Sequence, residues 1–226
     1  MLLAMAVDPG SRRKEYAELT RTAILDAAAE RFVADGYAAT SIDAVAAAAR
    51  VSKGSVYHHF SDKSELFEAV FVAMEQRLLA AVTAALATID DLWALMAAGT
   101  TVYLEFCSQP DFRRIALQEA PVALGWTRWR AIEERFFLGL ITAGLARMAE
   151  AGLIAIPPGD IAARMLLAAL SEAGLAVAAA PADQQADERN HAATVAEGFL
   201  RSLGTKPHRP RKSPGDPARP TSQPGG

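Results

Sequence analysis

The sequence predicts an all-α protein built from two helical units. Alanine, the residue with the highest helix propensity, dominates most of the chain, and β-branched runs are scarce. Apolar residues recur at helical spacing, with no strand-like alternation and no internal repeat. The expected helices are 15–35, 41–49, 53–59, 62–87, 91–107, 110–119, 125–151, 159–179 and 184–203. Gly36, Pro110, Pro121 and Pro157 mark helix ends between them.

Composition restricts the classes of protein that this chain can be. Its 226 residues are 51% hydrophobic, enough for one or two packed cores, and the net charge of −3 leaves room only for a local nucleic-acid site. The single cysteine excludes an intrachain disulfide framework and favours a reducing compartment. Charges interrupt the apolar runs before about 18 residues, and the opening "MLLAMAV" is too short for a secretory signal. We therefore expect a soluble cytoplasmic protein with no membrane partner.

The two ends of the chain differ from the rest. Residues 1–14 are expected to form a flexible arm, in which Arg12-Arg13-Lys14 either contact phosphates or form a solvated terminus. Residues 204–226 hold six of the twelve prolines and no large apolar side chain, which predicts a disordered tail. The tail carries five basic residues and one acidic residue, so it is either an auxiliary DNA-contacting arm or a solubilising extension.

Residues 40–60, "TSIDAVAAAARVSKGSVYHHF", read as two short helices joined by a tight turn. Thr40 and Asp43 are spaced as a capping box for the first helix. Its apolar stripe is Ile42, Val45, Ala46 and Ala49. Arg50-Val51 forms the turn, and Ser52 is the expected N-cap of the second helix.

The second short helix is expected to be anchored from below and polar on its outer side. Val56 and Phe60, four residues apart, point inward, toward Phe32, Tyr37 and Leu66 or Phe67. The outer side carries Lys53, Ser55, Tyr57, His58 and His59. Gly54 in its first turn permits close approach of the backbone to another molecule. This is the pattern of a helix-turn-helix, in which the second helix enters the major groove of DNA.

The residue types suggest separate contacts within such a site. Tyr57, His59 and Lys63 can donate hydrogen bonds to phosphate oxygens. Lys53, Ser55 and His58 are placed to meet base edges. From residue 11 to 63 eight basic residues face seven acidic ones, so affinity must depend on a few placed contacts.

The segment from "ILDAAAERFVADGY" through "TSIDAVAAAARVSKGSVYHHF" to "KSELFEAV" resembles the DNA-binding domain of the TetR family of bacterial transcriptional regulators over about fifty residues. One difference is the outer side of the first short helix, which is nearly all alanine. The resemblance implies a homodimeric, ligand-responsive repressor, less often an activator, without cofactor or metal. The expected DNA-binding residues are Thr40, Ser41, Ser52, Lys53, Gly54, Ser55, Tyr57, His58, His59 and Lys63. The DNA-binding domain is expected to span residues 15–62.

The larger unit, residues 63–203, is expected to bind a ligand and to dimerise. The segment "APVALGWTRWRAIEERF" is similar to a subgroup of TetR regulators. The candidate pocket residues are Trp93, Met96, Tyr103, Phe106, Cys107, Trp126, Trp129, Phe136 and Phe137. Each has the alternative of being an ordinary core residue. Polar groups that could orient a ligand are Tyr103, Gln118, Glu119 and Arg128.

The two C-terminal helices are rich in small apolar residues, and paired across a two-fold axis they would form a four-helix dimer interface. The expected partners are thus an operator in double-stranded DNA, a small apolar effector and a second copy of the chain. The long helix that starts near Asp62 belongs to both units. It is expected to couple effector binding to the spacing of the DNA-reading helices.

Two other classes of protein remain as alternatives. Glu188 and His191 form one E-x-x-H motif of a helical-bundle enzyme, but a di-iron site needs two such motifs, and the chain has four histidines in all. A DNA-binding protein without an effector would share the first domain and need no cavity.

Overall fold

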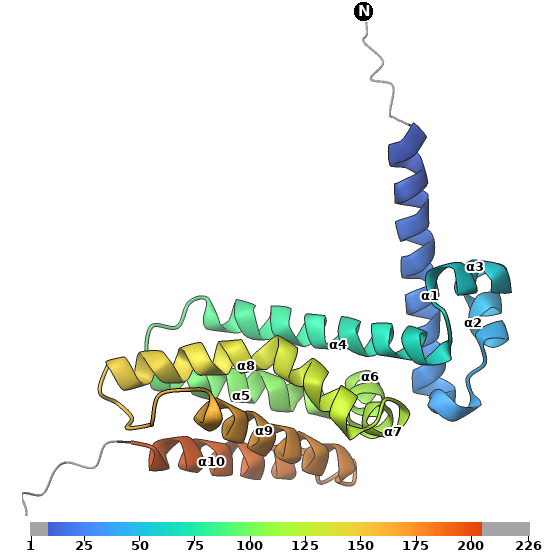
Figure 1. Cartoon of the computed structure of the whole chain (residues 1–226). Helices are drawn as coiled ribbons and strands as arrows, with labels where there is room; N and C mark the ends of the chain where they lie inside the picture. The colour runs from blue at the N-terminus through green and yellow to red at the C-terminus, as the bar shows by residue number, and fades with distance from the viewer. Residues whose placement is uncertain (1–8, 205–226) are drawn as a thin grey trace, which may run out of the picture.

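The computed structural model describes residues 9–204 (Figure 1). Regular secondary structure within this range is helical, apart from an isolated antiparallel bridge between Ile154 and Gly204. The helices are α1 (Pro9–Ala39), α2 (Ile42–Ala48), α3 (Lys53–His59), α4 (Lys63–Leu86), α5 (Leu92–Ser108), α6 (Pro110–Phe112), the π-helix η1 (Arg113–Glu119), α7 (Ala120–Ala123), α8 (Trp126–Glu150), α9 (Ile161–Ala179) and α10 (Gln185–Ser202). The all-α prediction is confirmed, and seven of the predicted helices agree with α2, α3, α4, α5, α8, α9 and α10 within two residues at each end.

The ends of the described chain differ from the prediction. Helix α1 begins at Pro9 and runs through a non-helical Gly36 to Ala39, so residues 9–14 are helical and not an arm. Residues 1–8 of the predicted arm lie outside the described residues. The predicted tail also lies outside them, except for Gly204. This residue donates its N–H to the carbonyl of Arg201 and forms the bridge to Ile154.

The segment predicted as one helix over 110–119 is instead two joined elements, α6 and η1, and α7 follows them directly. Pro121 was expected to end a helix, but it lies in the first turn of α7, which continues η1 directly. The Ala120 N–H bonds the Ile115 carbonyl five residues before it, but Pro121 has no N–H for the Ala116 carbonyl. That carbonyl instead accepts from the buried indole Nε1 of Trp129 at 3.0 Å. The prolines therefore shape this segment without interrupting it.

The predicted capping box at the start of α2 is wrong by one residue. Ser41 is the N-cap, and its Oγ accepts from the Ala44 N–H at 3.1 Å. Thr40 is 2% exposed and donates its hydroxyl back to the carbonyl of Gly36 at 2.8 Å, so it closes the end of α1. The Ser52 N-cap of α3 is confirmed, with the Ser55 N–H 3.0 Å from its Oγ.

Helices α1, α2 and α3 pack with the first turns of α4 into one unit, in which α1 stands across one end of the molecule (Figure 1). As predicted, Val56 and Phe60 are buried in a cluster that contains Phe32 and Phe67. The Phe32 and Phe67 rings meet edge to face with centroids 5.0 Å apart. This aromatic core fixes the position of the short α3.

Helices α4, α5, α8, α9 and α10 lie side by side in a bundle, with α4 and α10 on opposite sides (Figure 1). Helices α4 and α9 are long and apolar enough to span a membrane by length and composition, with mean hydropathies of 1.5 and 1.6. The charges within these runs therefore do not bring them below the membrane-span limit, contrary to the expectation from the sequence. Both helices contribute buried side chains to this bundle, as apolar core helices of soluble proteins do.

Candidate functional site

Helix α3 is held by one buried face and leaves the rest of its surface open. Val56 is fully buried, and the following Phe60 is 2% exposed. Lys53, Gly54 and His58 are exposed, and Tyr57 keeps 47% of its surface accessible. Ser55 and His59 are half-buried at the edges of this face. A rigid helix with a polar, accessible side is the element that a helix-turn-helix inserts into the major groove.

Gly54 is not required by the packing of the protein. A Cβ built on this residue would meet only the Ser52 Oγ, at an ordinary distance of 3.8 Å. Glycine in a helix is otherwise unfavourable relative to alanine. The missing side chain therefore makes space outside the protein, on the face that the sequence predicts to meet DNA.

Lys53 is paired within the protein. Its Nζ lies 2.9 Å from Oδ2 of Asp43 on α2, and both side chains are more than half exposed. The hydrogen bond and charge of Asp43 raise the pKa of Lys53. Exposed ion pairs contribute little to stability, so Lys53 can exchange Asp43 for a nucleic-acid acceptor at small cost.

Lys63 is placed differently from the other predicted contacts. Its Nζ donates to the carbonyls of Tyr37, Ala38 and Thr40 at 2.9, 3.3 and 3.1 Å. It also lies 4.5 Å from the centre of the Tyr37 ring. All three ammonium protons thus tie α4 to the end of α1. In this arrangement Lys63 stabilises the junction and has no free proton for a phosphate.

Arg50 is a candidate that the sequence analysis treated only as part of a turn. It has a φ of 56°, in the left-handed region where glycine is preferred, and it is exposed between α2 and α3. A basic side chain thus stands where the backbone favours glycine, in the turn that precedes α3. The sequence "AARVSKG" shows a basic residue at this turn but not its φ.

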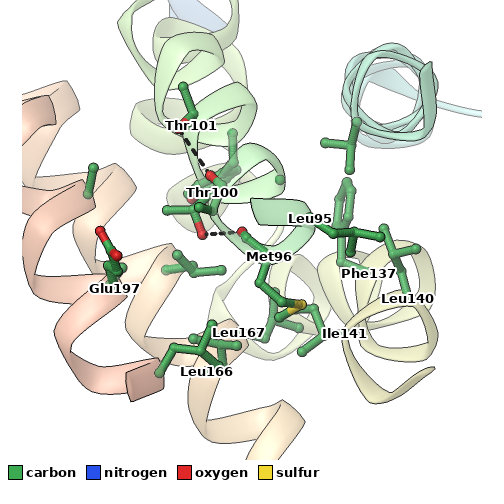
Figure 2. A pocket seen from close by; sticks show the side chains of 18 of the residues that line it. Leu95, Met96, Thr100, Thr101, Phe137, Leu140, Ile141, Leu166, Leu167 and Glu197 are labelled. Carbon is green, nitrogen blue, oxygen red and sulfur yellow. Dashed lines mark hydrogen bonds between the residues drawn. The ribbon is translucent and has the colours of Figure 1, made fainter. Parts of the chain in front are cut away.

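The bundle encloses a cavity of about 220 Å³ between α4, α5, α8, α9 and α10. Four of the predicted pocket residues, Trp93, Met96, Tyr103 and Phe137, line it. Figure 2 shows the Met96 thioether beside Ile141, with Leu166 and Leu167 from α9 on one side and Phe137 on the other. Its walls are mainly apolar, as in sites for small organic molecules.

The other five predicted pocket residues lie elsewhere. Trp129 and Cys107 are fully buried in the core, and Phe106 packs edge to face on Phe112 with centroids 5.6 Å apart. Phe136 is half-buried below the Arg135 guanidinium, and Trp126 is 58% exposed.

The remaining polar candidates have partners within the protein, between helices for Gln118 and Arg128 and within η1 for Glu119. Gln118 donates to the Ala178 carbonyl, Glu119 pairs with Arg114, and Arg128 pairs with Glu68. None of the three lines the cavity.

Two buried acids line the cavity and were missed. Glu75 is 3% exposed, and burial together with the charge of Glu133 raises its pKa well above the ordinary value. Glu133 is 5% exposed, and burial raises its pKa to about 7 against the opposing hydrogen bond from Ser171 and the charge of Arg130. The sequence held a signal, since Glu75 follows Phe71 by four residues and precedes Val82 by seven, on the apolar stripe of α4.

No metal cluster of three or more His, Cys, Asp or Glu side chains exists in the range that the structure describes. The His58 and His59 rings meet at a steep angle, with centroids 5.3 Å apart. Cys107 is buried, and burial raises the pKa of its thiol to about 12, which is unfavourable for a nucleophile.

Comparison with known proteins agrees with both halves of this arrangement. Residues 24–70 match the family described as bacterial regulatory proteins, tetR family, and residues 93–203 match the Tetracyclin repressor-like, C-terminal domain. The TetC protein of transposon Tn10 from Escherichia coli is 26% identical over 199 residues, which cover 87% of this chain and 98% of TetC. The HTH-type transcriptional regulator AcrR of Shigella flexneri is 39% identical over 67 residues, covering 30% of this chain and 31% of AcrR.

Solved structures show the same architecture. The chain superimposes on a TetR-family transcriptional regulator from Pectobacterium atrosepticum with a TM-score of 0.74 and 26% identity, covering 86% of this chain and 98% of that one. The matched families span both the helix-turn-helix and the cavity-bearing bundle. The chain belongs to the TetR family of transcriptional regulators, and it is a DNA-binding regulator and not an enzyme.

Proposed function

We propose that this regulator is a homodimeric repressor that leaves its operator when the bundle cavity binds a small, largely apolar molecule. The observation that carries this proposal is the reach of α4. Its first residue, Lys63, bonds the end of α1, whereas Leu78, Val82 and Leu86 line the cavity. The 24 residues of α4 span about 36 Å, so one rigid element joins the two sites.

The coupling follows from linkage between the two binding reactions. A ligand can favour a tilt of α4 that moves the two DNA-reading helices away from the spacing needed for DNA binding. Such a ligand must weaken DNA binding, and DNA must weaken ligand binding by the same factor. Half-sites one helical turn apart lie about 34–36 Å from each other, which sets the spacing the dimer must offer.

The surface proposed for the dimer lies on α9 and α10. On α9, Ile161 and Met165 are 56% and 55% exposed, and Ala168, Glu172 and Ala176 continue this exposed face at helical spacing, with Ala169 beside them. On α10, Val195 is 71% exposed. Small residues beside large apolar ones allow close helix packing, and a second copy of the same face would cover them.

The proposed DNA contacts divide into two kinds. Lys53 and Ser55 are assigned to base edges, and Tyr57 to a phosphate, because the first two lie at the start of α3 and Tyr57 further along its exposed side. The Lys53→Ala and Ser55→Ala variants should then change the sequence preference, whereas Tyr57→Phe should weaken binding to all sequences alike. Site selection from random DNA, followed by titration at two salt concentrations, separates the two outcomes.

The repressor mechanism is tested with the selected DNA site and a compound library. A compound that raises the Tm of the protein should also release the labelled DNA. A compound binds in the cavity if its Tm shift is lost in the Met96→Ala and Phe137→Ala variants. If such a compound leaves DNA binding unchanged, the inducible mechanism is refuted.

A further inference from the structure

Glu75 lies in the apolar interior of the bundle without a polar partner. It occupies the middle of α4, 3% exposed, on the face that carries Leu78 and Val82. No group within residues 9–204 donates a hydrogen bond to its carboxyl, which lines the cavity. Leaving a buried acceptor unpaired is costly, and leaving a buried charge unpaired costs more.

Glu133, across the cavity on α8, shows the contrast. It accepts from the Ser171 hydroxyl at 3.0 Å and from Nη1 of Arg130 at 3.3 Å. Arg130 also lies 3.6 Å from Glu134, so its charge is shared between two acids. Glu133 is therefore held by the protein, whereas Glu75 has no such support.

A second polar group without a strong partner borders the same cavity. The Tyr103 hydroxyl is buried beside the Cys107 thiol, which is a weak hydrogen-bond partner, and it has no stronger one among the described residues. Its position depends on Gly174 of α9, because a Cβ there would lie 2.2 Å from the Tyr103 hydroxyl oxygen and 2.9 Å from the Cys107 sulfur. The missing side chain at Gly174 thus leaves space for this hydroxyl beside the Cys107 thiol.

The charge of the cavity lining is predominantly acidic. The ionisable carboxyls of Glu75, Glu133 and Glu197 face a single lining base, Arg201. That base is already used, since Arg201 lies 2.7 Å from Glu197 and stacks on Trp93 with its guanidinium carbon 5.1 Å from the ring centre. No basic side chain of the lining remains for Glu75.

We infer that the cavity binds an apolar molecule carrying a protonated amine, whose N–H groups donate to Glu75 while its body packs against Leu78, Val82, Met96 and Phe137. The inference rests on the proposed function, in which this cavity is the effector site. It narrows the proposed effector from any small apolar molecule to an apolar molecule with a positive charge and hydrogen-bond donors.

The chemistry selects this class over others. An ammonium supplies several donors and the positive charge that the lining lacks. A carboxylate or phosphate would find no free basic side chain in the lining, and its charge would be repelled by Glu133 at pH 8, above the pKa of about 7 of that group. A neutral alcohol offers one donor and no charge, and hydrogen bonds to charged groups contribute more than those between neutral groups.

The test compares probes that differ only in the polar end. Binding of 4-phenylbutylamine, 4-phenylbutan-1-ol and 4-phenylbutyrate to the full-length protein is measured by calorimetry at pH 8. The amine should bind at least about tenfold more tightly than the alcohol, and the acid most weakly. The Glu75→Gln variant should lose this preference, whereas Glu197→Gln, at the Arg201 pair, should keep it.

Equal binding of amine and alcohol, an undiminished amine preference in Glu75→Gln, or no binding of the amine at millimolar concentration would each overturn the inference. Unfolding curves of Glu75→Gln show whether that variant remains folded. DNA release is measured separately. Glu75-dependent amine binding without release refutes the repressor mechanism alone, and release by compounds without amine preference refutes the ligand class alone.

Discussion

Gly54 is a residue whose chemistry is best explained by an external partner. Its helix would be more stable with alanine, and nothing within the protein opposes a Cβ. We predict that Gly54→Ala leaves the free energy of unfolding unchanged or raises it by up to about 1 kcal/mol. The same variant should bind its DNA site at least about tenfold more weakly. Chemical denaturation and fluorescence anisotropy measure the two effects.

The matched control is Gly139→Ala on α8, where a Cβ meets nothing within 4 Å. It should gain similar stability and keep DNA affinity. If Gly54→Ala binds DNA as well as this control does, α3 does not approach DNA through that residue.

Glu75 makes stability depend on pH in a predictable direction. Burial raises its folded pKa above 4.5, so between that value and the folded pKa the native state binds more protons than the unfolded state. Stability therefore falls as the pH rises through this window. Glu133, Tyr103 and Cys107 surround the carboxyl, and Glu133 adds to the same trend, with a pKa of about 7.

Glu75→Gln removes the ionisable carboxyl and with it the loss of stability at high pH. The Tm of the variant should exceed that of the wild type by about 3 °C or more at pH 8, with a smaller difference at pH 5. Thermal unfolding at both pH values measures it. A difference that is the same at both would mean that Glu75 does not change its protonation on unfolding.

At the scale of elements, the contact between the end of α1 and η1 joins the DNA-binding unit to the bundle. Gly36 has a φ of 79°, and a Cβ there would lie 2.6 Å from Nη2 of Arg114 and 2.8 Å from Oε1 of Glu119. Gly36→Ala should lower the free energy of unfolding by about 1–2 kcal/mol, because alanine disfavours this backbone conformation and the ends of the Arg114–Glu119 pair must move aside.

Gly125→Ala separates these two causes. Gly125 has the same φ of 79°, but a Cβ there meets nothing within 4 Å. It should cost only the backbone part, about 1 kcal/mol. Urea unfolding of both variants gives the difference, and equal losses would show that the α1–η1 contact adds no stability.

Sequence reasoning located most elements because their signals are local. Helix α3 was predicted with its observed ends, since the Ser52 cap and the Val56 anchor both lie within a few residues of it. The cap of α2 was assigned to Thr40 and not to Ser41. The two hydroxyls are adjacent, and only the burial of Thr40 against the end of α1 decides between them.

The parts that could not be predicted depend on contacts distant in sequence. The π-helical turns of η1 come with a hydrogen bond from Trp129, thirteen residues beyond Ala116. The aromatic residues of the bundle divide between cavity and core according to how the helices rotate, which periodicity alone does not fix. Lys63 was expected to be free, but the carbonyls it meets belong to residues 37–40.

At the scale of the whole molecule, the exposed face of α9 and α10 is the proposed dimer interface. Val195→Glu should convert the dimer to a monomer, because it places a charge in the proposed apolar interface. DNA affinity should fall with it, since a single α3 contacts one half-site. Light scattering coupled to size-exclusion chromatography gives the mass, and anisotropy gives the affinity.

Ala84→Glu is the control for added charge, on an exposed position of α4 on the opposite side of the bundle. It should leave both mass and affinity unchanged. A Val195→Glu protein that remains dimeric would place the interface on another surface.

The central claim is that ligand binding in the cavity and DNA binding by α3 are coupled through α4. The most direct measurement takes one compound that binds in the cavity. Its dissociation constant is measured for the free protein and for the DNA-bound protein, and the dissociation constant of the DNA complex is measured with and without the compound. The account predicts that both constants rise by the same factor, about 5- to 150-fold. A compound that occupies the cavity and leaves the DNA constant unchanged would contradict it.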